Sequence, residues 1–372
     1  MIIGVPKEIK THEYRVGLVP GSVRELIHHG HHVVVQNGAG LGAGFDDKAY
    51  IEVGAEILPH APAVFAKADL IVKVKEPQPS ELDHLRPGQT LFTYLHLAPD
   101  PKQAKGLLGS GVTAIAYETV TDAKGRLPLL APMSEVAGRM SVQAGAHHLE
   151  KEQGGAGILL GGVPGVAPAN VVVLGGGVVG SNAARMAIGL GARVTLLDTS
   201  LPRLAELDDH FGASLTTVYA TLDAVERHVV SADLVIGAVL VPGAAAPRLI
   251  TRAMLGRMRP GSVLVDVAID QGGCAETSRP TTHAAPTYVE EGVVHYCVAN
   301  MPGAVARTSA QALNNATLPF VLALADLGTT TALLMDPHLL AGLNVHQGRL
   351  TYEAVAQALS LPYVPARESL NQ

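Results

Sequence analysis

The chain has 372 residues and a formal net charge of −6, from 27 Lys and Arg against 33 Asp and Glu. Hydrophobic residues make up 48% and charged residues only 16%. This composition excludes intrinsic disorder and long coiled coils, which need far more charge. No run of basic residues appears, so we expect no nucleic-acid partner. At about 150 residues per domain, the length predicts two domains.

The cysteines and the apolar runs predict the compartment. Cys274 and Cys297 belong to no C-x-x-C or C-x-x-H pair, so we expect neither a disulfide framework nor zinc ligation, and a cytoplasmic location. Residues 1–7 lack a basic segment followed by a long apolar one, and we expect a first strand there rather than a secretion signal. Gly, Pro or charge interrupts every apolar run before the roughly 18 residues that cross a bilayer, so no membrane span is expected.

From residue 1 to about 128, short β-branched and apolar runs alternate with helical stretches. The predicted strands cover residues 2–5, 32–35, 69–75, 89–96 and 112–117, and the helical stretches cover 23–28, 61–66 and 101–108. Strand and helix in alternation are typical of a parallel sheet with helices on both faces, because each parallel pair needs a crossover connection.

A second alternation follows a long helical segment, residues 134–149, for which Ser134 is the expected N-cap. Beyond a glycine- and proline-rich stretch near 161–165, predicted strands cover 170–174, 192–198, 233–240 and 262–270 and form a second parallel sheet. From about residue 304 the chain is helical again, and 310–327 is expected to return to the first domain and cover its sheet. The expected domains are residues 1–130 with 306–372 and residues 131–305.

A glycine motif opens the second sheet. Gly175-Gly-Gly-Val-Val-Gly180 follows a predicted strand and precedes an alanine-rich helix, which is the context that G-x-G-x-x-G needs to bind a dinucleotide. Gly175 permits the tight turn, Gly177 lets the backbone approach a pyrophosphate, and Gly180 allows close packing of helix on strand. The helix N-terminus supplies unpaired N–H groups. The alternative is a glycine turn with a purely structural role.

The next predicted strand ends in Asp198, about 20 residues after the motif, where a carboxylate can accept both ribose hydroxyls of adenosine. The same carboxylate repels a 2′-phosphate, which favours NAD over NADP. Arg203, one turn later, leaves that preference open.

A second glycine run, Gly38-Ala-Gly-Leu-Gly-Ala43, fits the looser G-x-G-x-x-A form. Its context argues against a phosphate site. The segment Phe45-Asp46-Asp47 places carboxylates where a helix should offer positive potential, and no acidic strand end follows about 20 residues later. We expect a flexible loop here.

Three polar residues end predicted strands, where open parallel sheets bind their ligands. Lys75 and His96 end strands of the first domain, and Asp270 ends a strand of the second. Each has a structural alternative: Lys75 as a solvated strand end with Lys73 as its rival on the same face, His96 as one of 16 histidines, and Asp270 as a cap for the turn 271–273. The expected fold is two Rossmann-like, doubly wound parallel-sheet domains linked by long helices, with the active site in the cleft between them.

At these residues the sequence resembles a family. The segments Met1-Ile-Ile-Gly-Val-Pro-Lys-Glu-Ile-Lys10, Glu13-Tyr-Arg-Val16, Val72-Lys-Val-Lys-Glu-Pro77, Leu91-Phe-Thr-Tyr-Leu-His-Leu97, Met133-Ser-Glu-Val-Ala-Gly-Arg139 and Asn300-Met-Pro-Gly-Ala-Val305 look like those of bacterial alanine dehydrogenases. The resemblance runs through essentially the whole chain. The wider group is similar to the NAD-binding subunit of proton-translocating transhydrogenase, which shares the fold but not the chemistry.

The resemblance implies a role for each matching residue. Arg15 is implied to bind the substrate carboxylate, Lys75 its carboxylate or carbonyl oxygen, His96 to be the acid/base, and Asp270 the second acidic catalytic residue. The implied contacts with NAD are Ser134, Gly175, Gly177, Val178, Val179, Gly180, Asp198, Arg203, Val239, Leu240, Val267, Ala268, Ile269, Asn300 and Met301. Some members place a histidine at a metal site where this chain has Leu327, so no metal is expected. The family also implies a homohexamer.

The predicted activity is oxidative deamination of L-alanine. NAD takes a hydride from the alanine Cα, and water converts the resulting iminium ion through a carbinolamine to pyruvate and ammonia; the reverse direction fixes ammonium. One alternative is a related imine-reducing dehydrogenase of the opine or saccharopine type. Another is a transhydrogenase-like NAD(H)-binding subunit that docks on a membrane partner. The sequence leaves open the selectivity among alanine, serine, glycine and glyoxylate.

Overall fold

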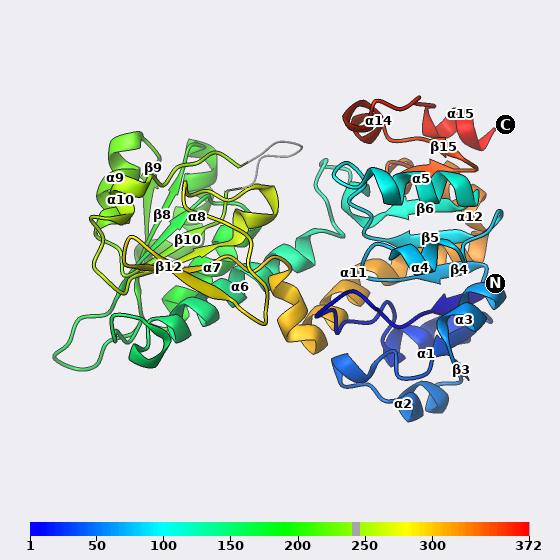
Figure 1. Ribbon diagram of the computed structural model, residues 1–372, viewed down its shortest axis with the longest axis horizontal. Coiled ribbons are helices and arrows are strands. Elements are labelled where there is room, and N and C mark those ends of the chain that lie inside the picture. The colour runs from blue at the N-terminus through cyan, green and yellow to red at the C-terminus, as the bar shows by residue number, and fades with distance from the viewer. Residues whose placement is uncertain (240–245, 372) are drawn as a thin grey trace. The chain divides into compact units, whose positions relative to one another are not determined.

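The computed structural model describes residues 1–239 and 246–371. It divides into two compact units, Met1–Met133 with Val305–Gln372, and Ser134–Ala304. Each unit is built on one sheet covered by helices (Figure 1). The expected fold class, two mainly parallel α/β sheets, is confirmed.

The first unit carries a sheet that has eight strands among the described residues, in the order β15-β14-β6-β5-β4-β1-β2-β3. The pairs from β6 to β3 are parallel, whereas β14 runs antiparallel to β6 and β15 antiparallel to β14. The strands are β1 Ile2–Val5, β2 His32–Gln36, β3 Glu56–Leu58, β4 Leu70–Val72, β5 Thr90–Thr93, β6 Thr113–Ala116, β14 Leu343–His346 and β15 Arg349–Leu350.

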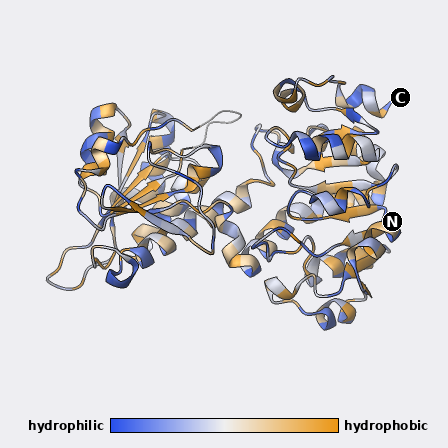
Figure 2. Ribbon diagram, viewed as in Figure 1, coloured by the Kyte–Doolittle hydropathy of each residue, from blue (hydrophilic) through white to orange (hydrophobic). Residues whose placement is uncertain are grey.

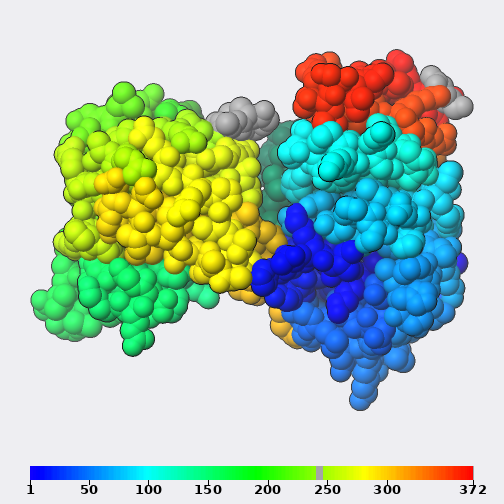
Figure 3. Space-filling view, in the orientation of Figure 1, coloured from blue at the N-terminus to red at the C-terminus, as the bar shows by residue number. Residues whose placement is uncertain are grey.

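Helices cover both faces of this sheet, and Figure 1 shows α4 and α5 in front of it and α11 and α12 behind. Val64, Phe65, Ala104 and Leu107 of α3 and α5 pack in one core with the strand residues. The C-terminal residues, red in Figure 3, lie at the surface beside the cyan segment. The helices are α1 Pro20–His28, α2 Asp47–Glu52, α3 Ala61–Lys67, α4 Pro79–Leu82, α5 Pro101–Ser110, α11 Ala306–Leu327, α12 Thr329–Met335, α13 Pro337–Leu340, α14 Glu353–Leu359 and α15 Ala366–Leu370, with short 3₁₀ turns η1 Leu41–Ala43 and η2 Tyr117–Thr119.

The return of the chain to the first unit is fixed by a buried amide. Asn314 of α11 accepts the N–H of Val19 at 2.8 Å and donates to the carbonyl of Gly17 at 3.1 Å. Both backbone groups belong to the loop between β1 and α1, so one side chain satisfies two buried polar groups that the sheet does not pair.

Among the described residues, no single helix is long and apolar enough to cross a bilayer. One bent pair, Met301–Leu327 with Thr329–Met335, meets the length and composition criteria only when its two helices are taken together.

The second unit carries a sheet with seven described strands in the order β12-β13-β11-β10-β7-β8-β9, parallel except for β12 against β13. The strands are β7 Asn170–Leu174, β8 Arg193–Asp198, β9 Leu215–Tyr219, β10 Leu234–Gly237, β11 Val263–Asp266, β12 Thr287–Glu290 and β13 Val293–Tyr296. The helices are α6 Ala131–His148, α7 Val178–Gly189, α8 Leu201–Phe211, α9 Leu222–Val230 and α10 Arg252–Leu255, and short 3₁₀ turns are η3 Lys151–Gln153, η4 Gly212–Ser214, η5 Val267–Gln271 and η6 Met301–Val305.

Both sheets are built from apolar strands, which are orange in Figure 2. The valines of β7 are almost fully buried, as expected for a parallel strand covered on both faces. Several predicted strands extend too far along the chain: β4 ends at Val72, β5 at Thr93 and β11 at Asp266. The N-cap expected at Ser134 is also wrong, because α6 begins three residues earlier, at Ala131.

Candidate functional site

The glycine turn of the second unit has the geometry that a dinucleotide requires. Gly175 has a φ of +98°, in the left-handed region that favours glycine. A Cβ on Gly180 would lie 1.8 Å from the carbonyl oxygen of Gly175, so helix and strand approach each other as closely as predicted. A Cβ on Gly177 would meet no atom within 4 Å, and this exposed residue is the N-cap of α7.

The N-terminus of α7 completes this half-site. The first N–H groups of a helix have no intrahelical partner, and here they belong to Val178, Val179 and Gly180. Val178 is 43% exposed. An anion placed above the turn would therefore meet N–H groups and the positive end of a helix of 12 residues. The arrangement fits the pyrophosphate of NAD.

Asp198 lies at the end of β8, half-buried, beside the glycine turn. Its Oδ2 accepts the N–H of Gly176 at 2.6 Å, and its Oδ1 accepts the N–H of Ser200 at 2.8 Å. Arg203, in the first turn of α8, donates from Nε to the carbonyl of Gly176 at 2.7 Å and pairs with Glu206 at 2.7 Å. Both side chains, which are predicted to contact the dinucleotide, therefore bind the turn itself.

The remaining predicted dinucleotide contacts of this unit follow other strands at the same edge. Val239 comes two residues after β10. Val267, Ala268 and Ile269 form the 3₁₀ turn η5 directly after β11. Asn300 and Met301 follow β13, and Asn300 has a φ of +65°. Carboxyl ends of parallel strands meet at one edge of a sheet, so these segments share the edge of the glycine turn. Leu240 lies outside the described residues.

Asp270 does not end a strand. It is exposed in η5, four residues beyond β11. The turn is built by the fully buried Asp266, whose Oδ1 accepts the N–H of Ala268 at 3.1 Å and whose Oδ2 accepts the N–H of Cys274 at 2.8 Å. Ser134 lies in the first turn of α6.

Three polar side chains of the first unit follow neighbouring strands. Arg15 lies in the loop after β1, Lys75 three residues after β4, and His96 three residues after β5. Strands β1, β4 and β5 are adjacent in the sheet and parallel. The sequence prediction selected Lys75 and His96 because they follow apolar strands, whereas Arg15 was implied only by the family resemblance.

Arg15 is oriented by a carboxylate two residues earlier. Its Nε donates to Glu13 Oε1 at 2.7 Å and its Nη2 to Glu13 Oε2 at 2.6 Å, which is a bidentate pair. Nη1 lies 3.0 Å from Met133 Sδ. The Arg15 side chain is 2% exposed, so the guanidinium plane is fixed and its charge is compensated inside the unit.

Lys73 and Lys75 differ sharply, although they are two residues apart. Lys73 is fully buried and pairs with Glu8 at 3.1 Å and Glu81 at 2.9 Å. The chain has already left β4, so the expected strand alternation that would put both lysines on one face does not hold. Lys75 is half-buried, and its carbonyl accepts from Thr93 Oγ1 at 2.9 Å. Burial lowers the pKa of Lys75, and the positive charge of Arg15 lowers it further.

His96 is held in an uncommon backbone conformation, with a φ of +48°. Its N–H donates to Glu118 Oε1 at 2.6 Å, which fixes that conformation. The ring stacks on Tyr94, with centroids 5.7 Å apart and planes at 24°. The side chain remains 47% exposed, and Nδ1 lies 3.8 Å from Glu76 Oε2. An imidazole so placed can exchange protons with a ligand.

The sequence prediction assigned no role to Glu13, Glu76 or Tyr94. All three lie within the motif segments, one or two residues from a predicted site residue, and that proximity was the available signal. Which of them faces the site depends on side-chain direction in loops, where no strand or helix periodicity applies.

The second glycine run is an ordered turn, not the flexible loop expected. Asp47 accepts the N–H of Gly38 at 2.8 Å, and Asp46 caps α2. Arg307 of α11 donates to the carbonyl of Gly44 at 2.9 Å. Carboxylates thus occupy N–H groups that a phosphate would need.

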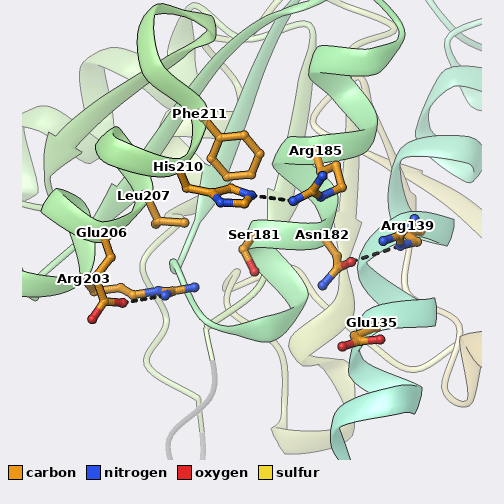
Figure 4. Close-up of a pocket in the computed structure, with 10 residues that line it drawn as sticks. All are labelled: Glu135, Arg139, Ser181, Asn182, Arg185, Arg203, Glu206, Leu207, His210 and Phe211. Atoms are coloured by element: carbon orange, nitrogen blue, oxygen red, sulfur yellow. Dashed lines mark hydrogen bonds and ion pairs between the residues drawn. The ribbon is translucent and has the colours of Figure 1, made fainter.

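A cavity of about 430 Å³ lies in the second unit between α6, α7 and α8, and Figure 4 shows the residues that line it. Each of its arginines has a partner within it: Arg139 donates to Asn182 at 3.0 Å, Arg185 contacts His210, and Arg203 pairs with Glu206. Apart from Arg203 it contains no predicted site residue. The lining residues are Glu135, Arg139, Ser181, Asn182, Arg185, Arg203, Glu206, Leu207, His210 and Phe211. In the described ranges no group of three or more His, Cys, Asp or Glu side chains could hold a metal.

The fold and the glycine turn define a dinucleotide-binding α/β protein whose other unit, the first, carries Arg15, Lys75 and His96 after adjacent strands. The family model described as alanine dehydrogenase/PNT, N-terminal domain, matches residues 4–137, and the C-terminal domain model matches 141–353. The chain belongs to this alanine dehydrogenase/PNT family, and the resemblance noted in the sequence is confirmed.

Relatives and solved structures agree. The chain is 67% identical to an alanine dehydrogenase of Halomonas elongata, over 98% of this chain and 99% of that protein. It is 56% identical to an alanine dehydrogenase of Bacillus subtilis, over 100% of this chain and 98% of that protein. An L-alanine dehydrogenase structure matches with a TM-score of 0.94 at 54% identity, covering 97% of this chain and 99% of that one. A transhydrogenase from Sinorhizobium meliloti matches with a TM-score of 0.81 at 26% identity, covering 95% and 100%.

Proposed function

We propose that this protein is an NAD-dependent alanine dehydrogenase, which converts L-alanine to pyruvate and ammonia and runs in reverse as a reductive amination. The observation that carries the proposal is the group formed by Arg15, Lys75 and His96 after three adjacent strands of one unit. The full-length relatives named alanine dehydrogenase, at 52–67% identity, give the reaction its substrate.

Two cations bind and orient the substrate. The bidentate pair with Glu13 occupies the Nε–Nη2 edge of Arg15, so the guanidinium meets a small carboxylate with its plane already set. Lys75 provides a point charge beside the carbonyl oxygen, where negative charge develops during addition to pyruvate. A three-carbon acid is short enough for both cations to act on it at once.

His96 exchanges protons with the water that adds to the imine and with the carbinolamine that follows. Its partly exposed ring and fixed backbone suit that role. Asp270, in the turn built by Asp266, positions ammonia or water and stabilises the cationic imine. Bound NAD accepts the hydride from the alanine Cα.

NAD binds to the second unit, where the turn Gly175–Gly180 and the α7 N-terminus hold the pyrophosphate. Asp198 accepts from the adenosine ribose, beside Arg203. The other proposed contacts are Ser134, Val239, Leu240, Val267, Ala268, Ile269, Asn300 and Met301. The negative charge of Asp198 favours NAD over NADP by repelling a 2′-phosphate. We also propose a cytoplasmic location, with Cys274 and Cys297 buried as free thiols, and a homohexamer.

The likeness to a transhydrogenase favours one second candidate, an NAD(H)-binding subunit that needs a partner. Alanine turnover by the purified chain alone excludes it. An opine- or saccharopine-type dehydrogenase is tested in the same assay, because it reduces pyruvate with ornithine or lysine faster than with ammonium.

The decisive experiment is steady-state kinetics of the purified protein with alanine and NAD or NADP, beside the variant His96→Ala. Wild type turns over alanine with NAD, and the variant loses turnover while NADH affinity stays nearly unchanged. A variant with the wild-type kcat contradicts the role of His96, and a wild type inactive on alanine contradicts the proposed function.

A further inference from the structure

Glu76 carries a buried oxygen that lacks a hydrogen bond. Its side chain is 13% exposed, and Oε1 pairs with Lys10. Oε2 has no hydrogen-bond partner among the described residues and lies 3.8 Å from His96 Nδ1. A buried carboxylate oxygen without a hydrogen-bond partner destabilises the folded protein, so its position beside the imidazole indicates a role other than stability.

The carboxylate is ionised at any pH at which the protein works. Burial opposes ionisation, but the nearby His96 imidazole and the charges of Lys10 and Lys75 outweigh it and lower the pKa of Glu76 to about 2. A second carboxylate near His96 is Glu118, but its oxygens accept the backbone N–H groups of Leu95 and His96. Glu76 is thus the carboxylate that faces the ring nitrogen.

Two contacts hold the imidazole near Glu76: Glu118 binds the backbone N–H of His96, and Tyr94 stacks on the ring. Nδ1 lies 3.8 Å from Oε2, so the two atoms need to approach by roughly 0.6–1.1 Å to reach the distance of an N–H···O hydrogen bond. A histidine that donates Nδ1–H to a carboxylate has one defined tautomer, in which Nε2 is the nitrogen that accepts a proton.

We propose that Glu76 is the positioning residue of His96: in the working enzyme its Oε2 accepts the Nδ1–H, fixes the tautomer with Nε2 as the proton-exchanging atom, and stabilises the imidazolium that forms during turnover. The inference rests on the proposed function. The carboxylate takes no proton itself. The competing explanation is that Glu76 serves only as the ion-pair partner of Lys10.

The test compares Glu76→Gln with Glu76→Asp, which keeps the carboxylate, and with Lys10→Met, which removes the other partner of Glu76. We expect Glu76→Gln to lower kcat about 10- to 100-fold, as for other residues that orient an acting histidine through a hydrogen bond. KM for pyruvate and NADH affinity should change less than about threefold. The acid limb of the kcat/KM profile should move to lower pH, because the imidazolium loses its neighbouring negative charge.

Glu76→Asp should recover part of the lost kcat and the wild-type pH profile, and Lys10→Met should keep kcat within about threefold. In a His96→Ala background, Glu76→Gln should leave the residual turnover of the single variant unchanged, because the effects of two residues that act as one unit are not additive. Equal losses in Glu76→Gln and Lys10→Met with an unshifted pH profile overturn the proposal, as does a full additional loss in the double variant.

Should Glu76→Gln fail to fold, the proposal is still decided by Glu76→Asp, whose carboxylate keeps its charge but is shorter by one methylene and reaches Nδ1 less well. A kcat below the wild-type value with an unchanged melting temperature and the wild-type pH profile agrees with the proposal, and a wild-type kcat contradicts it. A failure of the proposed function shows separately, as a wild type that does not turn over alanine.

Discussion

Asp198 Oδ2 accepts the backbone N–H of Gly176 at 2.6 Å, which joins the end of β8 to the glycine turn 22 residues earlier. The carboxylate thus braces the turn whose N–H groups face the proposed pyrophosphate, in addition to its proposed contact with the ribose. Asp198 thus acts on the proposed ligand in two ways, through the turn that faces the pyrophosphate and through the ribose. A substitution at Asp198 should therefore weaken both contacts.

We expect Asp198→Asn to weaken NADH binding about 10- to 100-fold, because a hydrogen bond to a charged group contributes roughly 1.5–3 kcal/mol. Discrimination against NADPH should fall as well, since the repulsion of a 2′-phosphate is removed. Fluorescence titration with both cofactors measures the two effects. Asp209→Asn, on the exposed side of α8, is the matched control and should bind NADH as wild type does. Unchanged NADH affinity in Asp198→Asn contradicts the assignment.

Substitution of two glycines of the motif, Gly180 and Gly177, should have different effects. A Cβ on Gly180 would lie 1.8 Å from a backbone oxygen, so Gly180→Ala must displace α7 and should lower both the melting temperature and NADH affinity. Gly177 has open space around its Cβ position, so Gly177→Ala should fold normally and lose only NADH affinity, because the methyl group meets the pyrophosphate.

Thermal shift and NADH titration separate the two outcomes, and Gly189→Ala, near the end of α7 with nothing within 4 Å, should leave NADH binding unchanged. Wild-type affinity in Gly177→Ala would mean that no phosphate approaches this turn.

The strand–helix alternation predicted the central strands of both sheets but missed β3, β9 and β12 to β15. β3, β9, β12 and β15 are half-exposed or short, so they carry no continuous apolar run. β13 and β14 are buried, but each includes a histidine. His295 bonds to Thr277 at 2.8 Å and His346 to Thr113 at 3.0 Å, and neither partner is a neighbour in sequence. These hydrogen-bond partners are brought together by the tertiary structure, so the sequence pattern alone did not indicate that the two histidines lie in buried strands.

The site residues were predictable to the extent that they follow apolar strands. Lys75 and His96 follow such strands closely, and both their position and the family motif pointed to them, whereas Arg15 lies ten residues after β1 and was found only through the family resemblance. Glu76 was not predicted, because its proposed role depends on the position of one carboxylate oxygen near His96, which is 20 residues further along the chain. Lys73 was taken as a rival to Lys75, and only its burial between two carboxylates shows that it is structural.

The lowered pKa of Lys75 predicts an alkaline limit on substrate binding. Below that pKa the ammonium holds the pyruvate carboxylate or carbonyl; above it the amine is neutral and the attraction is lost. KM for pyruvate should therefore rise at a pH below 10.5, the ordinary value for lysine. Steady-state kinetics across pH measures it.

Lys75→Arg supplies the control for that limit. A guanidinium stays charged throughout the accessible range, so the alkaline rise in KM should disappear, although KM is higher at every pH because the fork of donors replaces a compact charge. An identical alkaline rise in Lys75→Arg would place the titration on another group.

Lys73 should be among the residues on which the stability of the first unit depends most. Its Nζ pairs with Glu8 and Glu81, and the three side chains are at most 2% exposed. Lys73→Met leaves two buried carboxylates without a cation, and breaking a buried pair costs about 3–5 kcal/mol. Denaturant unfolding measures the loss.

Lys67→Met is the surface control, since Lys67 and Glu56 are 39% and 38% exposed and such a pair contributes less than about 1 kcal/mol. The triple variant Lys73→Met, Glu8→Gln, Glu81→Gln should regain most of the stability. Its amide oxygens still accept the N–H groups of Val74 and Gln78, which Glu8 and Glu81 bind at 2.7 and 2.8 Å, while none of the three charges of this triad remains. If Lys73→Met cost no more than Lys67→Met, water would have to reach the two carboxylates, and the triad would not be the sealed charge cluster that its burial indicates.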